Sequence, residues 1–185
     1  MPDKDITIQV VFRKIKYEEK NEAEAPKYLE EKVVNEDGTY TFNLVKGQKY
    51  PVAEFRKIPK TTYKIREEKS DKKIASINAK GIIAAKKAGT AKIDLLIDNK
   101  IINVTVNVYE PRYSVKKEQM KVGESKQLDF DAKGFSVSYS IAPKQQRFAT
   151  VDAVTGVVST KAKGKVCVIA TVNGKQYKIN VKIIP

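Results

Sequence analysis

Two stretches of the chain decide the fold, because they are variants of one sequence. Residues 74–108 read IASINAKGIIAAKKAGTAKIDLLIDNKIINVTVNV, and residues 148–183 read FATVDAVTGVVSTKAKGKVCVIATVNGKQYKINVKI. Gly81 and Gly89 in the first stretch correspond to Gly156 and Gly164 in the second, at an offset of 75 residues. A repeat of this length exceeds a solenoid unit and has the size of one small domain used twice.

The repeated sequence has the pattern of short antiparallel strands. Both copies end in an alternating run, 102–108 and 177–183, with apolar side chains at every second position. Asp98-Asn99 and Asn173-Gly174 precede these runs as hairpin turns, and Gly81 and Gly156 suit turns that need a positive φ. The pattern predicts an all-β fold made of two tandem β-sandwiches, each with a thin aliphatic core.

The segment in front of the repeats is expected to be a short, β-rich anchor. Residues 6–10 alternate as a strand does, and Val11, Phe12 and Ile15 extend the apolar run. The sequence Asn-Glu-Asp-Gly at 35–38 predicts a hairpin between 33–34 and 39–45. The Glu- and Lys-rich stretch 17–32 is predicted to be a solvated loop, in preference to a short helix starting at Pro26.

These patterns divide the chain into three parts. We expect an N-terminal segment over 1–44, a first domain over 45–110 and a second domain over 111–185. The join, Tyr109-Glu110-Pro111-Arg112, has no Gly/Ser tract and contains a φ-restricted proline. The two domains are therefore expected to stand end to end as a rod.

The repeated motif resembles the bacterial Ig-like domain of group 2. Members of that family read "A-x-V-[DN]-x-x-G-x-V-x-A-x-x-x-G-x-A-x-I" before a final V-x-V strand, and both copies follow this pattern. The family's "V-x-V-G" start is matched by residues 121–123 and more loosely by 45–47, while Tyr63 and Tyr139 stand where the family often has Trp. The resemblance covers about three quarters of the chain. It implies Ig-like sandwiches of the kind found in bacterial surface proteins and in virion proteins of tailed phages.

Charge is distributed unevenly along the chain. The net charge is +14, and formal charges give −3 for residues 1–44, +9 for 45–112 and +8 for 113–185. Only five of the 36 basic residues are Arg, which argues against sequence-specific nucleic-acid recognition. Exposed lysines are candidates for weak contact with a polyanion or a host-surface glycan, although a solubilising exterior is the favoured reading: Lys86, Lys87, Lys161, Lys163 and Lys165.

The residues for most catalytic chemistry are missing. The chain has no histidine, so it has no Ser-His-Asp or Cys-His arrangement and no His-ligated metal. We predict no enzyme activity, no metal and no cofactor. Asp129 and Asp131 are read as a solvated strand face in preference to calcium ligands. Cys167, the single cysteine, is read as a small buried hydrophobe in preference to a reactive thiol.

Two functions fit this organisation. The first is a virion component of a tailed phage (head decoration, fibre-like or tail-associated) that docks to capsid or tail subunits and projects its Ig-like domains. The docking strands are expected to use Ile6, Ile8, Val10, Phe12, Tyr40 and Phe42. The alternative is a fragment of a bacterial cell-surface or adhesion protein. The N-terminus MPDKDITIQV lacks an apolar secretory stretch, which favours the virion, and no run is long enough for membrane insertion.

Overall fold

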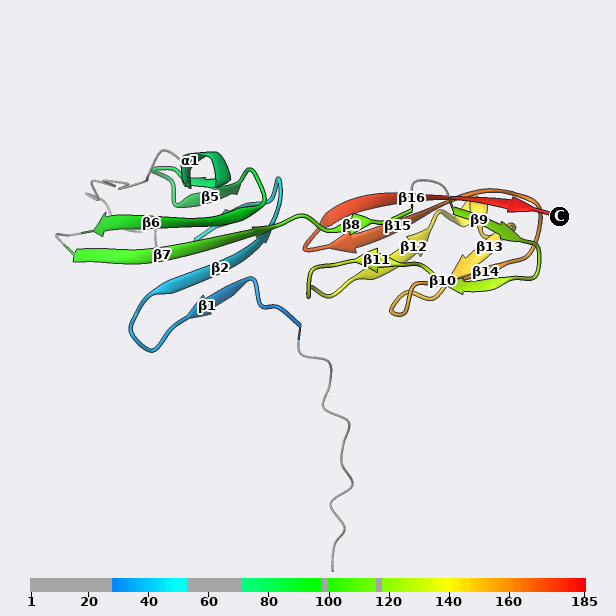
Figure 1. Ribbon diagram of the computed structural model, residues 1–185, viewed down its shortest axis with the longest axis horizontal. Coiled ribbons are helices and arrows are strands. Elements are labelled where there is room, and N and C mark those ends of the chain that lie inside the picture. Colours follow the sequence, from blue (N-terminus) through cyan, green and yellow to red (C-terminus); the bar gives the residue numbers. More distant parts are fainter. Residues whose placement is uncertain (1–27, 53–70, 98–99, 116–117) are drawn as a thin grey trace, which may run out of the picture.

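The chain folds into two Ig-like β-sandwiches placed end to end (Figure 1). The computed structural model describes residues 28–52, 71–97, 100–115 and 118–185. Strands make up nearly all of the regular structure in these ranges, which confirms the predicted all-β fold class. The predicted strand over 6–15, and with it Ile6, Ile8, Val10 and Phe12, lies outside the described residues, as does Tyr63.

The first sandwich contains a four-stranded and a three-stranded sheet. The four-stranded sheet has the order β1-β2-β7-β6, with bounds Lys32–Val34, Tyr40–Val45, Lys100–Tyr109 and Gly89–Ile97. The three-stranded sheet has the order β3-β5-β4, with bounds Lys49–Pro51, Ile82–Ala85 and Ala75–Ile77. A single helical turn, α1 (Asp71–Ile74), lies beside β6, where the Lys92 backbone N–H donates to the Asp71 carboxylate at 2.9 Å. The sequence had not predicted this turn.

The second sandwich likewise contains a four-stranded and a three-stranded sheet, but its fourth strand lies at the opposite edge of the larger sheet. Its four-stranded sheet has the order β12-β15-β16-β9, with bounds Ser138–Ile141, Gly164–Val172, Lys175–Ile184 and Glu118–Lys121. Its three-stranded sheet has the order β10-β14-β13, with bounds Ser125–Gln127, Val157–Thr160 and Ala149–Val151. A two-stranded pair joins β8 (Arg112–Tyr113) to β11 (Phe130–Asp131), and a 3-10 turn, η2, spans Pro143–Gln145.

Each sandwich holds one parallel strand pair among otherwise antiparallel pairs. β2 runs parallel to β7 in the first sandwich, and β9 runs parallel to β16 in the second. β2 and β9 lie at the start of their repeats, and β7 and β16 lie at the end. The starting and final strands of each repeat are therefore neighbours in one sheet. This closure repeats at the same place in both copies, as expected for a duplicated unit.

Two separate aliphatic cores fill the sandwiches. The first draws on Leu44, Ile83, Ile93 and Val106, among others, and the second on Met120, Val158, Val168 and Ile179 among others. The alternating runs place these side chains inward and their polar neighbours outward, as the sequence pattern predicts. The core of each sandwich is therefore thin and rich in β-branched residues.

The predicted turns are present. β1 and β2 form the hairpin expected around Gly38, with Lys32 opposite Phe42, and Gly38 has a φ of 77°. Asn173 and Gly174 have φ values of 46° and 73°, the type I′ geometry that links β15 to β16. Residues 28–31 contain no helix, in agreement with the predicted loop.

One predicted boundary is wrong. A division after residue 44 cuts β2, and Phe42 and Leu44 are fully buried in the first core. Phe42 therefore cannot be a docking contact, because its side chain already packs inside the sandwich. Tyr40 packs partly against the same core, with its ring stacked 6.3 Å from that of Phe42. The division near residue 110 remains a prediction.

Candidate functional site

A third apolar cluster lies at the junction of the two sandwiches. Val45 from β2 and Val172 from β15 are fully buried there, and Phe135 keeps 3% exposure. The ring of Tyr109, the last residue of β7, meets the Phe135 ring edge-on at 5.5 Å and 84°. Val45 and Tyr109 come from one sandwich and Phe135 and Val172 from the other, so the two sandwiches share a small core.

Polar contacts cross the same junction. The Lys175 ammonium, at the start of β16, donates to the backbone oxygen of Lys46. The connector between β7 and β8 is only Glu110-Pro111, and Pro111 is buried. A surface ion pair joins Lys46 to Glu110 at 2.6 Å, but both side chains are about half exposed, so it adds little. The junction is therefore fixed mainly by packing and by the short connector.

Residues 28–31, called here the strap, hold both sandwiches at once. The Leu29 backbone N–H donates to the Gly134 oxygen of the second sandwich at 2.9 Å. On the other side, the buried Asn43 donates through its side-chain amide to the Glu30 oxygen and through its backbone N–H to the Glu31 oxygen, both at 2.9 Å. The strap therefore adds backbone hydrogen bonds to the apolar junction.

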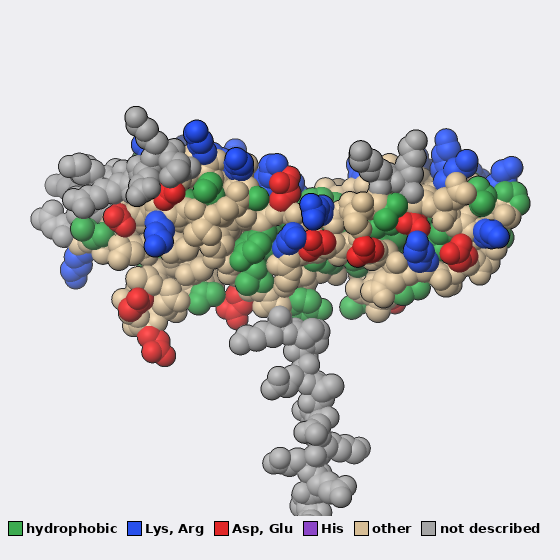
Figure 2. All heavy atoms as spheres, in the orientation of Figure 1, with side chains coloured by type: hydrophobic (Ala, Val, Ile, Leu, Met, Phe, Trp, Pro, Cys, Tyr) green, Lys and Arg blue, Asp and Glu red, His purple; other side chains and the backbone are tan. Residues whose placement is uncertain are grey.

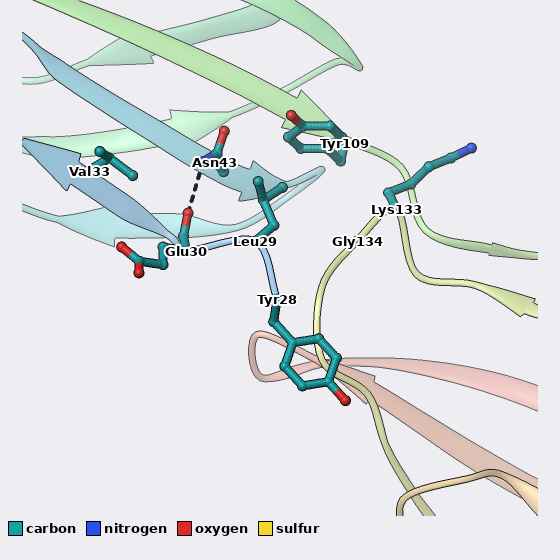
Figure 3. A pocket seen from close by; sticks show the side chains of 8 residues that line it. All are labelled: Tyr28, Leu29, Glu30, Val33, Asn43, Tyr109, Lys133 and Gly134. Atoms are coloured by element: carbon teal, nitrogen blue, oxygen red, sulfur yellow. Dashed lines mark hydrogen bonds between the residues drawn. The ribbon is translucent and has the colours of Figure 1, made fainter. Parts of the chain in front are cut away.

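Beside the strap lies a hollow of about 600 Å³. Figure 3 shows the Leu29 side chain directed toward Tyr109, while the Tyr28 ring hangs below the strap. Tyr28 is 50% exposed, and the remaining wall is formed by Val33, Asn43 and the 133–134 turn. Figure 2 shows an apolar patch at this waist of the molecule, where the described chain begins. The charged lining residues, Glu30 and Lys133, point their side chains away from one another (Figure 3), so the hollow is suited to accepting an apolar protein segment.

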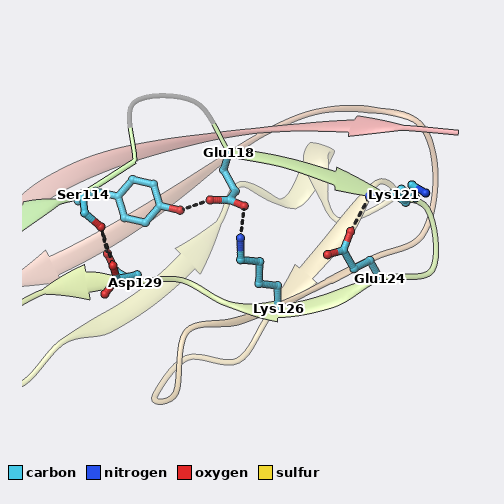
Figure 4. A network of polar contacts seen from close by, with 7 residues as sticks. Ser114, Glu118, Lys121, Glu124, Lys126 and Asp129 are labelled. Atoms are coloured by element: carbon cyan, nitrogen blue, oxygen red, sulfur yellow. Dashed lines mark hydrogen bonds and ion pairs between the residues drawn. The ribbon is translucent and has the colours of Figure 1, made fainter.

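The second sandwich contains a buried carboxylate that replaces a core aromatic. Glu118 pairs with Val181 in β16, as Phe42 pairs with Val106 in β7, so the two residues are structural equivalents. Glu118 is 4% exposed and receives hydrogen bonds from the Tyr113 hydroxyl at 2.6 Å and the Lys126 ammonium at 2.7 Å (Figure 4). The second copy thus fills this core position with a polar network.

Burial and hydrogen bonding in this network shift the pKa values of Glu118 and Tyr113. Burial tends to raise the pKa of Glu118, but the hydrogen bonds from Lys126 and Tyr113 outweigh it and hold the pKa below its usual 4.5. Burial, followed by the hydrogen bond to the Glu118 carboxylate, raises the pKa of Tyr113 above its usual 10.0. Glu118 is therefore an ionised acceptor at neutral pH, and both of its carboxylate oxygens are bound within the network, by Tyr113 and Lys126.

The predicted contact lysines do not form one site. Lys86 and Lys87 follow β5 in the first sandwich, and Lys161 and Lys163 lie in the turn between β14 and β15 of the second. All are exposed, and Lys86 donates to the Lys72 backbone oxygen at 3.0 Å. Lys165 differs, because it points outward from β15 beside other basic side chains. Figure 2 shows Lys and Arg gathered along the upper edge and far end of the second sandwich.

Two further assignments can now be compared with the structure. Cys167 is half-buried on the outer face of β15 between the inward Val166 and Val168, so it is less buried than the expected small core hydrophobe. Asp131 pairs with the Lys133 ammonium, and Asp129 accepts a 2.6 Å hydrogen bond from the Ser114 hydroxyl. Across the described ranges, no three His, Cys, Asp or Glu side chains are grouped to hold a metal ion. None of the helices in these ranges has the length and apolarity needed to cross a bilayer.

Comparisons with known proteins give the following. No protein-family model matches the chain, and no curated protein matches it. Among solved structures, domains 4 and 5 of the S-layer protein SbsC are similar at 15% identity, over 66% of this chain and 77% of that one, with a TM-score of 0.32. Domains 4–9 of SbsC are similar at 16% identity, over 83% of this chain and 27% of that one, with a TM-score of 0.32. Protocadherin gamma C5 EC1-3 is similar at 8% identity, over 78% of this chain and 66% of that one, with a TM-score of 0.36. Function has to be argued from the residues of this chain.

Proposed function

We propose that the chain is a non-enzymatic spacer and display protein whose two sandwiches act as one stiff element. The junction supports this most directly. Val45, Phe135 and Val172 are buried between the sandwiches, and the strap makes hydrogen bonds to both. Sandwiches joined by a loose tether would reorient freely, whereas a shared core and a two-residue connector hold one orientation.

We infer that the stretch before residue 28 docks the protein to its partner. Ile6, Ile8 and Val10 alternate with polar residues and Val11-Phe12 extend the apolar run, a pattern suited to adding a strand to the edge of a partner sheet. The strap places Tyr28 at the waist of the molecule, beside the junction (Figure 3). A partner bound there would hold the element by its middle and leave the outer ends of both sandwiches free for display.

The setting we propose is the virion of a tailed phage, with a capsid or tail subunit as the docking partner and the sandwiches on the particle surface. The duplicated Gly-x-[IV] turn motif, with Gly81 and Gly156 at φ values of 69° and 73°, supports membership of both units in the group 2 bacterial Ig-like domains. The alternative setting is the surface of a bacterial cell, where the same stiff pair would space or display an adhesive end.

A deletion of residues 1–27 tests the proposal, because it removes the docking stretch and keeps the strap. The deleted protein should sediment apart from virus particles while the full chain sediments with them, and both should show the same thermal unfolding. A point variant, Ile8→Asp, should reduce particle association at least ~10-fold, because a charge on the apolar side of an added strand disfavours burial. Val154→Asp, at a 75% exposed position of the second sandwich, is the control and should associate normally.

Two results would count against this. Full association of the deleted protein would contradict docking through residues 1–27. Recovery of the full chain with the cell envelope and not with particles would replace the virion setting with the bacterial surface.

A further inference from the structure

The outer face of the β12-β15-β16-β9 sheet carries positive charge and no carboxylate. Outward positions alternate with the buried core positions along each strand, so they can be read from the strand register. Four of them are exposed lysines: Lys121, Lys165, Lys178 and Lys182. The others are uncharged: Gln119, Ser138, Ser140, Cys167, Ile169, Thr171, Gln176, Asn180 and Ile184. The carboxylate of Glu118, which also belongs to this sheet, points inward to Tyr113 and Lys126 (Figure 4).

Two of these lysines directly oppose each other. Lys165 on β15 is the cross-strand partner of Lys182 on β16, and Gln119 on β9 continues the same row. Like charges in directly opposed positions destabilise a sheet. Within the described parts of the chain, neither lysine forms an ion pair that would offset the repulsion. The pair is an arrangement that an anion lying across it would stabilise.

A groove runs past this pair to η2. A hollow of about 500 Å³ over β15 and β16 is lined by Cys167, Asn180 and Lys182, and also by the buried Glu118, whose carboxylate is bound by Tyr113 and Lys126. It adjoins a second hollow of about 600 Å³ lined by Lys144 and Arg147. Gln145 and Lys165 line both hollows, so the two form one continuous groove.

Side-chain contacts fix two walls of the groove. The Gln145 side-chain oxygen accepts the Cys167 backbone N–H at 3.2 Å, which restrains its amide group at the groove. The Arg147 guanidinium lies over the Phe148 ring at 4.5 Å, an arrangement that restricts a long side chain. The groove therefore combines four cationic side chains with one amide, that of Gln145, held in place by a hydrogen bond.

We propose that this groove binds an anionic polysaccharide, with Lys165 and Lys182 taking one carboxylate between them. Lys144 and Arg147 would take a second carboxylate farther along the chain of sugars, and Gln119, Gln145 and Asn180 would hydrogen-bond the intervening hydroxyls. Alternating cations and amides match a polymer whose carboxylates are separated by hydroxyls.

Nucleic acid matches this groove less well. Single-stranded nucleic acid is held by aromatic stacking platforms, and the one ring here, Phe148, is half-buried and already covered by Arg147. The site also has a single Arg to make bidentate contacts with phosphate. The site does not depend on docking through residues 1–27, so each proposal can fail without the other.

The test is a calorimetric titration of the full chain with oligogalacturonate at 0.15 M salt. Lys165→Gln and Lys182→Gln should each weaken binding ~10-fold, since each removes a charge-assisted hydrogen bond. Lys86→Gln and Lys87→Gln remove the same charge from the first sandwich and should leave the affinity unchanged. Without ligand, Lys182→Gln should raise the thermal midpoint slightly, because it relieves the repulsion from Lys165.

Three results would overturn the proposal. Equal losses for Lys86→Gln and Lys182→Gln would mean attraction by net charge alone. Equal affinity for the fully methyl-esterified oligomer would remove the role of the carboxylate. Tighter binding of an oligothymidylate of the same charge would assign the groove to nucleic acid.

Discussion

The rings of Tyr109 and Phe135 meet edge-on, 5.5 Å apart, although they belong to different sandwiches. Tyr109 is the last residue of β7 and directly precedes the connector Glu110-Pro111. Phe135 lies in the loop between β11 and β12. Together with Val45 and Val172 they convert a short connector into a packed joint. The stiffness of the molecule depends on this contact.

Replacing Phe135 with Ala should loosen the joint. The side chain is 3% exposed, and truncating a buried Phe leaves a cavity and costs about 3–5 kcal/mol of the free energy of unfolding. Urea unfolding should show this loss, and small-angle scattering should show a broader range of molecular shapes. Val154→Ala, on an exposed loop, is the control and should change stability by less than ~0.5 kcal/mol. If Phe135→Ala loses the expected free energy of unfolding but leaves the scattering curve unchanged, the aromatic contact does not hold the two sandwiches in line.

Acid should destabilise the second sandwich partly through Glu118. The pKa of Glu118 is lowered in the folded chain, so its contribution is complete above about 4.5 and disappears as the pH falls through the lower, folded value. Glu118→Gln should therefore lower the free energy of unfolding at pH 7 by about 1–3 kcal/mol, and by progressively less toward pH 3. Denaturant unfolding across this range measures the difference. A gap between variant and parent that stays constant with pH would show that ionisation of Glu118 is not the cause.

Gly156→Ala should lower the stability of the protein much more than Gly174→Ala does. Both have a φ of 73°, so both substitutions carry the same backbone strain of about 1–2 kcal/mol. A Cβ at position 156 would lie 2.7 Å from the Tyr139 ring, whereas one at 174 meets nothing within 4 Å. Gly156→Ala should therefore cost about 1–3 kcal/mol more, from overpacking against a buried ring. Thermal unfolding of the two variants compares them directly, and equal midpoints would mean that Tyr139 moves aside without cost.

Residues 111–185 should fold as a separate unit with an exposed apolar end. Their own core, which includes Met120, Val158 and Val168, contains no residue of the first sandwich. The fragment should unfold cooperatively. It should also bind a hydrophobic dye through Phe135 and Val172, because the first sandwich no longer covers these side chains. Phe135→Ser in the fragment should reduce the dye signal. A fragment without cooperative unfolding would show that the second sandwich needs the first.

The hairpins and turns could be predicted because their geometry depends on local sequence. Gly38 and Gly174 adopt φ values that few other residues accept, so the Asp-Gly and Asn-Gly pairs mark the turns directly. The alternating strands could be predicted for a similar reason, since a side-chain period of two follows from the backbone alone.

The start of the first sandwich was predicted wrongly because the two copies of the repeat have different types of residue at that place. Phe42 in the first copy corresponds to Glu118 in the second, and comparing the two sequences gives no sign that both are buried. The side of the sheet that Cys167 faces could have been read from its neighbours. Val166 and Val168 both point inward, and this parity places Cys167 outward, whereas cysteine's general preference for burial favoured a more buried position.

The junction and the groove could not be predicted from local sequence. Leu29, Phe135 and Val172 come from three distant segments, and only the folded chain brings them together. The pairing of Lys165 with Lys182 follows from the Asn173-Gly174 hairpin, but the approach of Gln145 to Cys167, which completes the groove, appears only in the folded chain.

The most direct test of the stiff two-sandwich element is a distance measurement across the junction. Spin labels at Lys92→Cys and Lys178→Cys, in a Cys167→Ser background, report the separation of the sandwiches by pulsed electron paramagnetic resonance. A packed junction predicts one narrow distance distribution, which broadens when Phe135→Ala is added. A broad distribution in the parent protein, unchanged by that substitution, would contradict a stiff element.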